Sequence, residues 1–401
     1  MKCLMVHNSY QQPGGEDQVF EAEAGLLESF GHTVVRFTAH NDQIRTLGQL
    51  ELARATIWNG DTYRDVRAIL QREQPEVLHA HNIFPLISPS IYYAARAEHV
   101  PVVQTLHNYR LVCPNALLFR DGHICEDCLL ARSPIAGVVH ACYRNSRAAT
   151  GVVAAMLTMH RALGTWTRLI DVFIALSDFA RNKYIEGGLP PAKIVVKPNF
   201  IFPDPGQREA DGSYALFVGR LTPDKGVHTL LAAWERLGHE IPLKIAGTGP
   251  LAADVEDAAR RLVGVEWLGN VPRDDVLAYM KHAAFLVIPS LWYEAFGVVI
   301  AEAYGVGIPV IASDLGSMSG LIRSGYTGLH FRPGDIEDLV SQVRWALAHR
   351  EEMRVMGDHA RHEYETWYAP ERNYDLLMHA YALAISRATR RRAGRPLARV
   401  Q

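Results

Sequence analysis

The sequence predicts an α/β protein built from two open, doubly wound sheets. Short apolar strands alternate with helical stretches through both halves of the chain, which is typical of parallel strands covered by helices. At 401 residues the chain exceeds what one hydrophobic core usually fills, so two domains of roughly 150 to 200 residues each are expected. A proline-rich stretch at 197–206 interrupts the alternation and suits a linker.

The first half begins with a compact apolar strand at 2–7 and a helix at 18–29 that stops before Gly31. Further strands are expected at 33–37, 77–79, 102–106 and 172–176. The alternation restarts after the linker, with strands at 214–219, 243–247, 265–269, 285–288 and 309–312. We therefore place one domain at 1–200, a second at 201–375, and a helix end with a basic tail at 376–401. The two domains would face one another across a cleft, with ligand beyond the carboxyl ends of the strands.

The charge and the apolar runs of the sequence argue against a nucleic-acid-binding protein and against a membrane-spanning one. The net charge of −2 gives no electrostatic reason to expect nucleic acid. No apolar run reaches the ~18 residues of a membrane span, and the start is too short and too polar for a signal peptide, so a cytoplasmic protein is expected. The arginine-rich last fifteen residues are expected to be disordered. Contact with the inner face of a membrane is the alternative, suggested by this tail and by Phe84, Tyr92 and Tyr93. The sequence carries no sign of an oligomeric state.

Two acids eight residues apart, Glu294 and Glu302, flank a strand-to-helix loop in the second half. The strand before them is apolar, and a helix is expected to open just after Gly297, which places Glu302 on that helix. The free amide groups of a helix N-terminus hold phosphate, and carboxylates bind sugar hydroxyls. A nucleotide sugar offers both groups.

Arg220 and Lys225 share the turn after the strand at 214–219. Both can reach a diphosphate and offset the charge that grows on a departing nucleoside diphosphate. Glycine pairs at 14–15 and 247–249 are turns where backbone can approach phosphate closely. His107 ends the strand at 102–106 on the side expected to face the cleft, and His79 and His81 compete for the same role.

These motifs together resemble the retaining glycosyltransferases of family 4, whose GT-B fold pairs two Rossmann-like domains. The likeness covers essentially the whole chain and is most specific at 217–313. It implies that Arg220 and Lys225 bind the donor diphosphate, that Glu294 holds hydroxyls of the donor sugar, and that Glu302 holds the ribose. His107 would lie near the C6 end of the sugar, so that His107, Arg220, Lys225 and Glu294 form the catalytic set.

The resemblance also assigns donor contacts to glycines and backbone amides. These positions are Gly14, Gly15, Gly219, Gly247, Gly249, Asn270, Ala295, Phe296, Gly297 and Val298. Gly14 and Gly15 fit the loop by which such enzymes close over donor and acceptor. The chain departs from the family pattern at 292–293, where Trp-Tyr stands before Glu294, and at 200–201, where Phe-Ile replaces Gly-Val. These departures bear on the sugar pocket and the hinge.

Catalysis is expected to be independent of metal, because no Asp-x-Asp pair stands in a suitable loop and Arg220, Lys225 and the helix N-terminus can meet the leaving-group charge. The product is expected to be a polysaccharide or glycoconjugate. Three alternatives are a nucleotide-sugar epimerase on the same scaffold, a non-catalytic nucleotide-sugar-binding protein, and a glycosidase using Glu294 and Glu302. The last would leave the Arg-Lys turn and the glycine turns without a role.

Four of the five cysteines cluster in an insert at about 108–145: Cys113, Cys125, Cys128 and Cys142. One Cys-x-x-Cys pair between two single cysteines can close a tetrahedral zinc site, which would fix the insert beside His107. Reduced thiols in a loop are the alternative of about equal weight, and a thioredoxin-like redox pair is the weakest.

Overall fold

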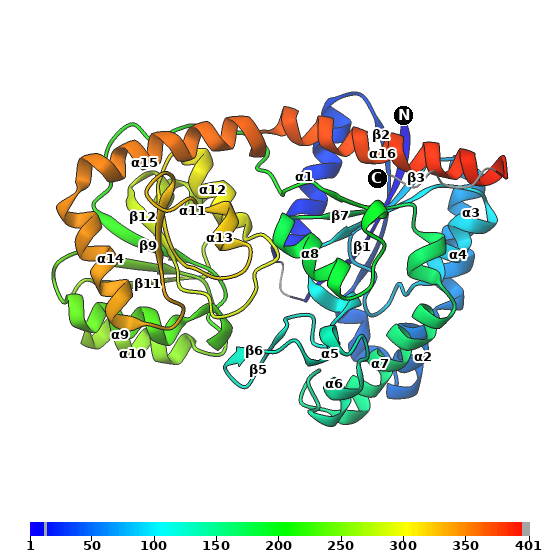
Figure 1. The fold of residues 1–401 in the computed structure, drawn as a ribbon, viewed down its shortest axis with the longest axis horizontal. Coiled ribbons are helices and arrows are strands. Elements are labelled where there is room, and N and C mark those ends of the chain that lie inside the picture. The colour runs from blue at the N-terminus through cyan, green and yellow to red at the C-terminus, as the bar shows by residue number, and fades with distance from the viewer. Residues whose placement is uncertain (12–13, 395–401) are drawn as a thin grey trace. The chain divides into compact units, whose positions relative to one another are not determined.

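The computed structural model describes residues 1–11 and 14–394, and it divides into two units, each with a six-stranded sheet (Figure 1). One unit comprises residues 1–118 and 125–198 together with the described residues from 373 onward. The other comprises residues 119–124 and 199–372. The prediction of two doubly wound α/β domains is confirmed. The prediction divided the chain at residue 200, whereas in the structure the chain returns to the first unit from residue 373 onward.

The first sheet has the order β2-β1-β3-β4-β7-β8, and all its strands pair in parallel. The strands are β1 (Lys2–Ser9), β2 (Thr33–His40), β3 (Val77–Ala80), β4 (Val102–Leu106), β7 (Val172–Ala175) and β8 (Ile194–Val196). The first five confirm the predicted strands. The edge strand β8 has three residues, too few to show a pattern in the sequence. A separate antiparallel hairpin joins β5 (Phe119–Arg120) to β6 (His123–Ile124).

Helices connect the strands of the first unit. They are α1 (Gly15–Ser29), α2 (Gln49–Ile57), α3 (Gly60–Glu73), α4 (Ser90–Ala97), α5 (Asp127–Leu130), α6 (Ile135–Val139), α7 (Arg147–Ala162) and α8 (Asp178–Glu186). Shorter helical turns are η1 (Asn41–Thr46), η2 (Tyr109–Leu111), η3 (Thr165–Leu169) and η4 (Pro191–Lys193). The α1 helix begins three residues before the predicted start, at the glycine pair.

The last helix, α16 (Pro370–Arg392), completes the core of the first unit. Its Leu377 and Tyr381 are fully buried with Met5 of β1 and Phe20 of α1. The expectation of disorder from residue 387 is wrong for residues 387–392, which form the end of this helix. Arg387 Nη1 donates to the Asp171 carbonyl at 2.7 Å and Arg391 pairs with the Asp171 carboxylate, which fixes the basic end. The arginines at 395 and 399 lie outside the described residues.

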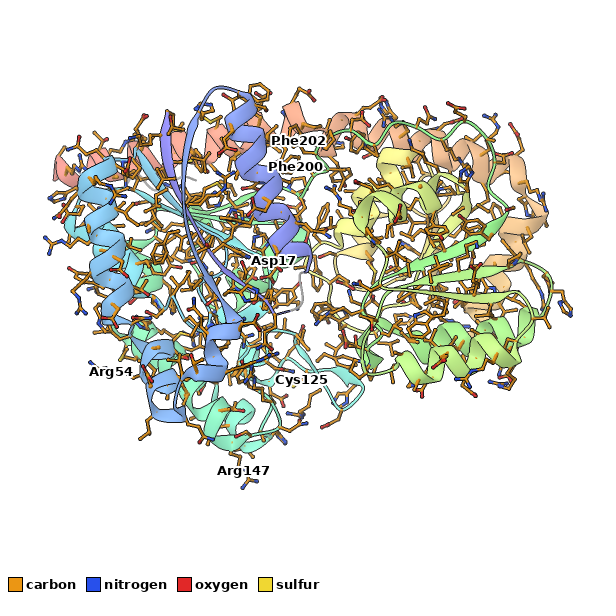
Figure 2. The ribbon with its side chains drawn as sticks, turned by 180° about the vertical axis from the view of Figure 1, so that it is seen from behind. Asp17, Arg54, Cys125, Arg147, Phe200 and Phe202 are labelled. Atoms are coloured by element: carbon orange, nitrogen blue, oxygen red, sulfur yellow. The ribbon has the colours of Figure 1, made fainter. Side chains whose placement is uncertain are left out.

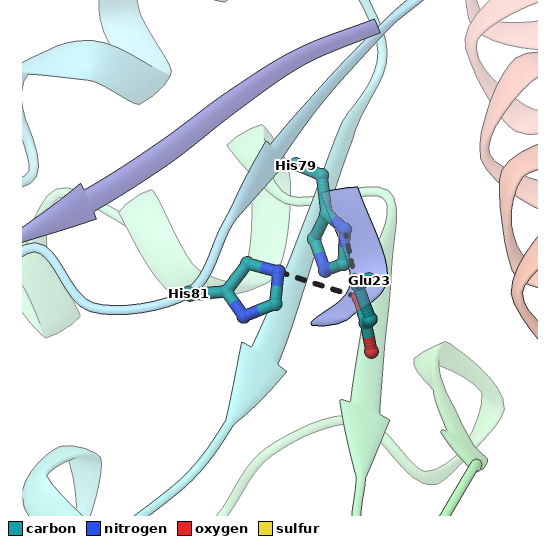
Figure 3. A group of neighbouring side chains, drawn as sticks. All are labelled: Glu23, His79 and His81. Atoms are coloured by element: carbon teal, nitrogen blue, oxygen red, sulfur yellow. Dashed lines mark ion pairs between the residues drawn. The ribbon is translucent and has the colours of Figure 1, made fainter. Parts of the chain in front are cut away.

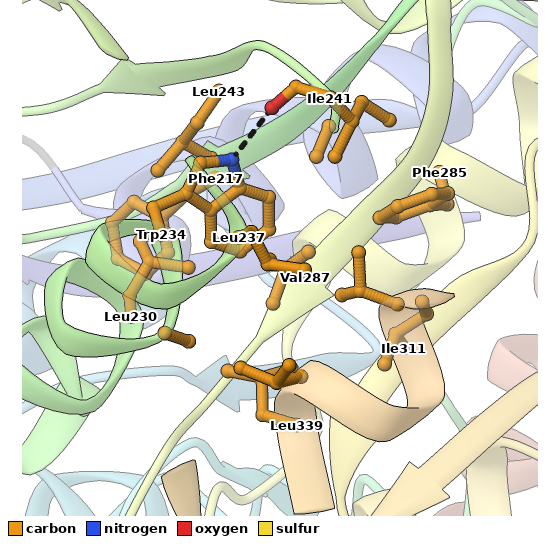
Figure 4. Close-up of a cluster of buried hydrophobic side chains, with 14 of the residues drawn as sticks. Phe217, Leu230, Trp234, Leu237, Ile241, Leu243, Phe285, Val287, Ile311 and Leu339 are labelled. Atoms are coloured by element: carbon orange, nitrogen blue, oxygen red, sulfur yellow. Dashed lines mark hydrogen bonds between the residues drawn. The ribbon is translucent and has the colours of Figure 1, made fainter. Parts of the chain in front are cut away.

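The second sheet has the order β11-β10-β9-β12-β13-β14, again parallel throughout. Its strands are β9 (Tyr214–Val218), β10 (Leu243–Ala246), β11 (Val265–Gly269), β12 (Ala283–Ile288), β13 (Val310–Ser313) and β14 (Gly328–Phe331). All but β14 were predicted. Figure 4 shows the core on one face of this sheet, where Trp234 packs with Phe217 and Phe285 and donates from Nε1 to the Ile241 carbonyl at 3.0 Å.

The helices of the second unit are α9 (Val227–Leu237), α10 (Ala252–Arg261), α11 (Arg273–Lys281), α12 (Val298–Val306), α13 (Met318–Leu321), α14 (Ile336–Ala348) and α15 (Arg350–Glu363). Two helical turns, η5 (Pro223–Lys225) and η6 (Tyr364–Tyr368), complete it. Across residues 1–11 and 14–394, no helix combines the length and the apolar composition that a bilayer span requires.

The strand orders locate the point in each sheet where ligands bind in doubly wound folds. In such sheets the crevice opens beyond the carboxyl ends of two neighbouring strands whose connections run in opposite directions. In the second unit these strands are β9 and β12, and in the first unit they are β1 and β3. The loops that follow β1, β9 and β12 carry predicted site residues, among them Gly14, Lys225 and Glu294.

Candidate functional site

Glu294 lies in the loop between β12 and α12 and is nearly fully buried. One carboxylate oxygen, Oε1, accepts hydrogen bonds from Lys225 Nζ at 2.5 Å, Ser290 Oγ at 2.8 Å and Trp292 Nε1 at 3.0 Å. The structure thus joins two residues that are 69 positions apart in sequence. Charge-assisted bonds of this kind fix both side chains at the carboxyl ends of β9 and β12.

Gly226 explains how the turn carrying Lys225 comes so close to the end of β12. Its φ is +70°, and a Cβ at this position would stand 1.8 Å from the Pro289 carbonyl oxygen. Only glycine allows this backbone approach. The Lys-Gly sequence therefore sets the position of the ammonium group, and the bulky Trp292 that departs from the family pattern is one of the donors that hold Glu294.

Gly247 and Gly249 follow β10 and pack against the turn after β9. A Cβ on Gly247 would stand 1.9 Å from the Gly219 carbonyl oxygen, and one on Gly249 would stand 2.5 Å from that of Leu221. Both glycines have positive φ, at +144° and +159°. The backbone of the two turns is thereby brought into contact at the edge of the sheet. Arg220 follows β9 and is exposed, and Asn270 follows β11 and is exposed as well.

Helix α12 opens beside Glu294. Its N-cap, Gly297, has a φ of +80° and provides no side-chain cap for the first turn. The Ile300 amide donates to the Gly297 carbonyl at 2.9 Å, and the amides of Val298 and Val299 before it open the helix, where first-turn amides have no intrahelical acceptor. Ala295 and Phe296, just before it, are buried, and the Ala295 carbonyl accepts from Ser317 Oγ at 3.1 Å.

Glu302 is buried within α12 and pairs with a residue that the sequence did not single out. Arg273, the first residue of α11, donates from Nε to Glu302 Oε1 at 3.2 Å and from Nη1 to the Phe202 carbonyl at 3.3 Å. Burial raises the pKa of Glu302, and Arg273 opposes that rise. A carboxylate in such surroundings binds hydroxyl donors strongly, because it has few competing partners.

In the first unit His107 follows β4 and contacts His81, which follows β3. His81 Nδ1 lies 3.0 Å from His107 Nε2, while His81 Nε2 lies 3.3 Å from Glu23 Oε2. The carboxylate favours a proton on His81 Nε2, which leaves Nδ1 as an acceptor for a proton on His107 Nε2. His107 Nδ1 is then an acceptor. Burial, together with His81, holds the pKa of His107 well below its usual range, so the ring is neutral.

Glu23, His79 and His81 form a buried group whose potential metal-binding atoms, one from each residue, all lie within 4.8 Å of one another (Figure 3). The negative charge of Glu23 is already neutralised by an ion pair, because Lys197 Nζ lies 2.5 Å from Glu23 Oε1 and is itself fully buried. Burial alone would raise the pKa of Glu23, but Lys197 and the two histidines hold it well below its usual range. Both nitrogens of His79 are engaged, one by Tyr381 and the other by Thr105. We therefore interpret the group as a structural ion pair that orients His81.

The glycine pair stands at the start of α1. Gly14 is the N-cap, and its amide donates to Asp17 Oδ2 at 2.7 Å, while Gly15 is the first helical residue. Asp17 Oδ1 is 2.9 Å from His7 Nε2, at the end of β1. These bonds tie the glycine loop to the carboxyl end of β1, next to β3, which carries His79 and is followed by His81.

The four clustered cysteines are all thiols, and they occur in the insert of the first unit. Cys113 and Cys128 are buried, and Cys125 and Cys142 are partly buried. Burial, and then the nearby charges of the other three cysteines, raises the pKa of Cys128 to about 11. Among the described residues, however, no three cysteine sulfurs lie within 4.8 Å of one another, so the structure groups them without closing a tetrahedral site.

Two family models match the chain. Residues 14–204 match glycosyltransferase family 4, and residues 201–363 match glycosyl transferases group 1. MJ1178 of Methanocaldococcus jannaschii, an uncharacterized glycosyltransferase, is 22% identical over 369 residues, 90% of this chain and 92% of that protein. The glycogen synthase of Mycobacterium tuberculosis is 36% identical over 138 residues, which are 33% of each protein.

The fold is that of a solved member of the GT-B class. The crystal structure of Anabaena Alr3699/HepE in complex with UDP matches with a TM-score of 0.68 at 18% identity, over 95% of this chain and 100% of that one. The two family models meet near the boundary between the units, and each matches most of one unit. The chain therefore belongs to the group 1 glycosyltransferases of family 4, and it is an enzyme that transfers glycosyl groups.

Proposed function

We propose that this enzyme moves a sugar from a nucleoside-diphosphate sugar, with UDP or GDP as the nucleotide, to a hydroxyl acceptor. The reaction would retain the anomeric configuration and would serve the synthesis of a polysaccharide or glycoconjugate. The observation that carries the proposal is the contact of Lys225 with Glu294 at the start of α12, where the connections after β9 and β12 diverge. Cation, carboxylate and helix N-terminus there suit a diphosphate joined to a sugar.

The leaving nucleoside diphosphate would be stabilised by charge rather than by covalent chemistry. Lys225 and the exposed Arg220 supply two cations on one turn, and the first amides of α12 supply dipoles. The residues assigned to this task are Arg220, Lys225 and the backbone at 295–298. HepE, the neighbour of similar fold, was crystallised with UDP and with UDP-glucose, which supports the choice of donor.

Neither acid of the pair is suited to attack the sugar as a glycosidase carboxylate would. Glu294 Oε1 already accepts from three donors, and Glu302 Oε1 accepts from Arg273. Strong hydrogen bonds to a carboxylate oxygen lower its nucleophilicity. We assign Glu294 to the hydroxyls of the donor sugar and Glu302 to the ribose.

His107 would bind a sugar hydroxyl through Nδ1, the nitrogen that its contact with His81 leaves as an acceptor. A cavity of about 40 Å³ lies beside it, lined among others by Phe84, Arg110 and Trp166. This volume suits a few water molecules or one hydroxymethyl group, because a water needs roughly 10 to 15 Å³ of such space. It is too small for a whole sugar ring.

The test is thermal stabilisation of the purified protein by UDP, GDP, ADP and their sugars. A ligand that binds only the folded state raises the melting temperature by mass action. We expect one nucleotide to stabilise the wild type and Glu302→Ala to lose the effect. Glu266→Ala, an exposed acid on β11, is the matched control and should keep it. A wild type stabilised by none of these nucleotides would contradict the donor assignment.

The acceptor is tested separately, with the donor that stabilises the protein and a panel of sugar and lipid-linked acceptors. Transfer is expected to need both substrates, and the anomeric proton of the product reports its configuration by NMR. Inversion would overturn the retaining mechanism alone. A product made from the donor without an acceptor would indicate an epimerase.

A further inference from the structure

The segment from Cys128 to Ile170 in the first unit contains no acidic residue. It includes α6, α7 and most of α5, and it carries five arginines at positions 132, 144, 147, 161 and 168. All five arginines are exposed, and none forms an ion pair with another described residue. An uncompensated positive charge of this size is unusual in a chain whose overall charge is −2.

The same segment exposes apolar side chains. Ten large apolar residues are exposed in the described chain, and five of them lie here: Leu130, Ile135, Val139, Met159 and Leu163, at 72%, 68%, 56%, 37% and 56% exposure. Isolated exposed apolar residues are ordinary, but contiguous ones mark interaction sites. We call this set, with the five arginines, the α6–α7 patch.

Helix α7 shows why the patch is not an ordinary surface. A helix at the protein surface normally has charged residues on its outer face. The exposed positions along α7 between its terminal arginines are Ala148, Ala155, Thr158 and Met159, all uncharged. The arginines stand at its two ends, Arg147 and Arg161. Because the outer face has no charge and an arginine stands at each end, the helix can lie against a bilayer without placing a charge among the acyl chains, and the two arginines can meet the head groups.

Hydrogen bonds hold the two parts of the patch together. Arg147 Nε donates to the Val139 carbonyl at 3.3 Å, and Arg161 donates to the carbonyl of Arg132. The start of α7 therefore lies beside the end of α6, and the end of α7 lies beside the residues that precede α6. Figure 1 shows α5, α6 and α7 together, and in Figure 2 the Arg147 side chain points away from the ribbon.

We propose that the α6–α7 patch docks on the surface of an anionic lipid bilayer. The apolar side chains enter the interface, and the arginines contact the negative head groups, whose charge complements a segment without acids. The proposal does not depend on the glycosyl-transfer reaction. It also differs from the expectation drawn from the sequence, because Tyr92 is fully buried and bonded to Gln104, and Arg387 and Arg391 of the basic tail are engaged by Asp171.

The experiment is co-sedimentation of the full chain with vesicles, without any sugar donor. The wild type should bind vesicles of phosphatidylglycerol and phosphatidylcholine, should bind phosphatidylcholine alone at least about tenfold more weakly, and should be released by salt. Ile135→Asp with Val139→Asp should lower the partition coefficient about tenfold or more. Met159→Glu, on the other helix, should lower it in the same direction.

Val263→Asp is the matched control, because Val263 is 70% exposed but lies in the second unit, outside the patch. It should bind vesicles as the wild type does. Circular dichroism of each variant establishes that it is folded. The proposal is overturned if the wild type does not sediment with anionic vesicles, or if folded patch variants bind as well as the control. Concentration-dependent dimers that the patch variants abolish, without vesicle binding, would identify the patch as a contact between copies of the chain.

Discussion

The ammonium group of Lys225 lies 2.5 Å from Glu294 Oε1, and Glu294 itself is nearly fully buried. Each charge therefore holds the other in place before any donor binds. A diphosphate would compete with Glu294 for the ammonium, while the sugar hydroxyls would take up the carboxylate. Under the proposed function, the pair would couple recognition of the two halves of a nucleotide sugar.

Separate substitutions of the pair should have opposite effects on nucleotide binding. Lys225→Met removes a charge-assisted contact and should weaken binding of the nucleoside diphosphate about tenfold or more. Glu294→Gln frees Lys225 from its anionic partner, so the same diphosphate should bind as well or better while turnover is lost. Isothermal titration calorimetry with the diphosphate alone checks both. If Glu294→Gln weakened diphosphate binding as much as Lys225→Met, the division of roles would be incorrect.

Glu23 and Lys197 should contribute to stability as a unit. Both are fully buried and 2.5 Å apart, so removing either charge takes the opposite charge away from the other in the core. Glu23→Gln or Lys197→Met alone should cost about 3 to 5 kcal/mol of unfolding free energy. The double variant should be more stable than either single variant. Urea unfolding of the four proteins gives the interaction energy, and additive losses would show that the pair is not coupled.

Local pattern was enough to predict most strands and the charged residues that follow them. Lys225 stands on a short turn after an apolar strand, and Glu294 and Glu302 flank a strand-to-helix loop. Both features can be recognised from the local sequence. Strand β8 has three residues and β14 has four, which is too short for a period to show.

Pairings between distant residues could not be predicted in this way. Arg273 reaches Glu302 from another helix, and Lys197 reaches Glu23 across 174 positions. No local property of the sequence indicates these partners. The burial of Glu23 could nevertheless be predicted from the sequence. It follows Phe20 by three residues and precedes Leu27 by four, so it falls on the buried face of α1.

The buried histidines should make the protein unstable in mild acid. Burial lowers the pKa of His79, His81 and His107 in the folded state. Unfolded histidines bind protons below about pH 6.5, whereas these three remain neutral when folded. Their contribution to stability is therefore complete above that pH and is lost as the pH falls. If all three histidines take up a proton on unfolding, the free energy of unfolding would fall by up to about 4 kcal/mol per pH unit.

Unfolding midpoints at pH 8, 6 and 5 measure this dependence, since they run from about 1.5 units above to about 1.5 units below the pKa of an unfolded histidine. His79→Gln should reduce the slope between neutral and acid pH. His228→Gln, at a side chain that is 62% exposed, should leave the slope unchanged. Equal slopes in the wild type and His79→Gln would show that the buried rings are not the source.

The cysteine group should bind zinc, although its sulfurs are not drawn together to ligand distances. Cys113, Cys125, Cys128 and Cys142 are gathered in one insert, and two of them are buried. Zinc thiolate bonds of about 2.3 Å would require the insert to tighten around the metal, and that tightening would fix the insert. We expect near-stoichiometric zinc by mass spectrometry in protein purified without added metal. Cys128→Ser should lose it, whereas Cys3→Ala, the fifth cysteine, in β1, should keep it. A wild type without zinc, or a Cys128→Ser variant with full zinc content, would leave the cysteines as reduced thiols that pack the insert.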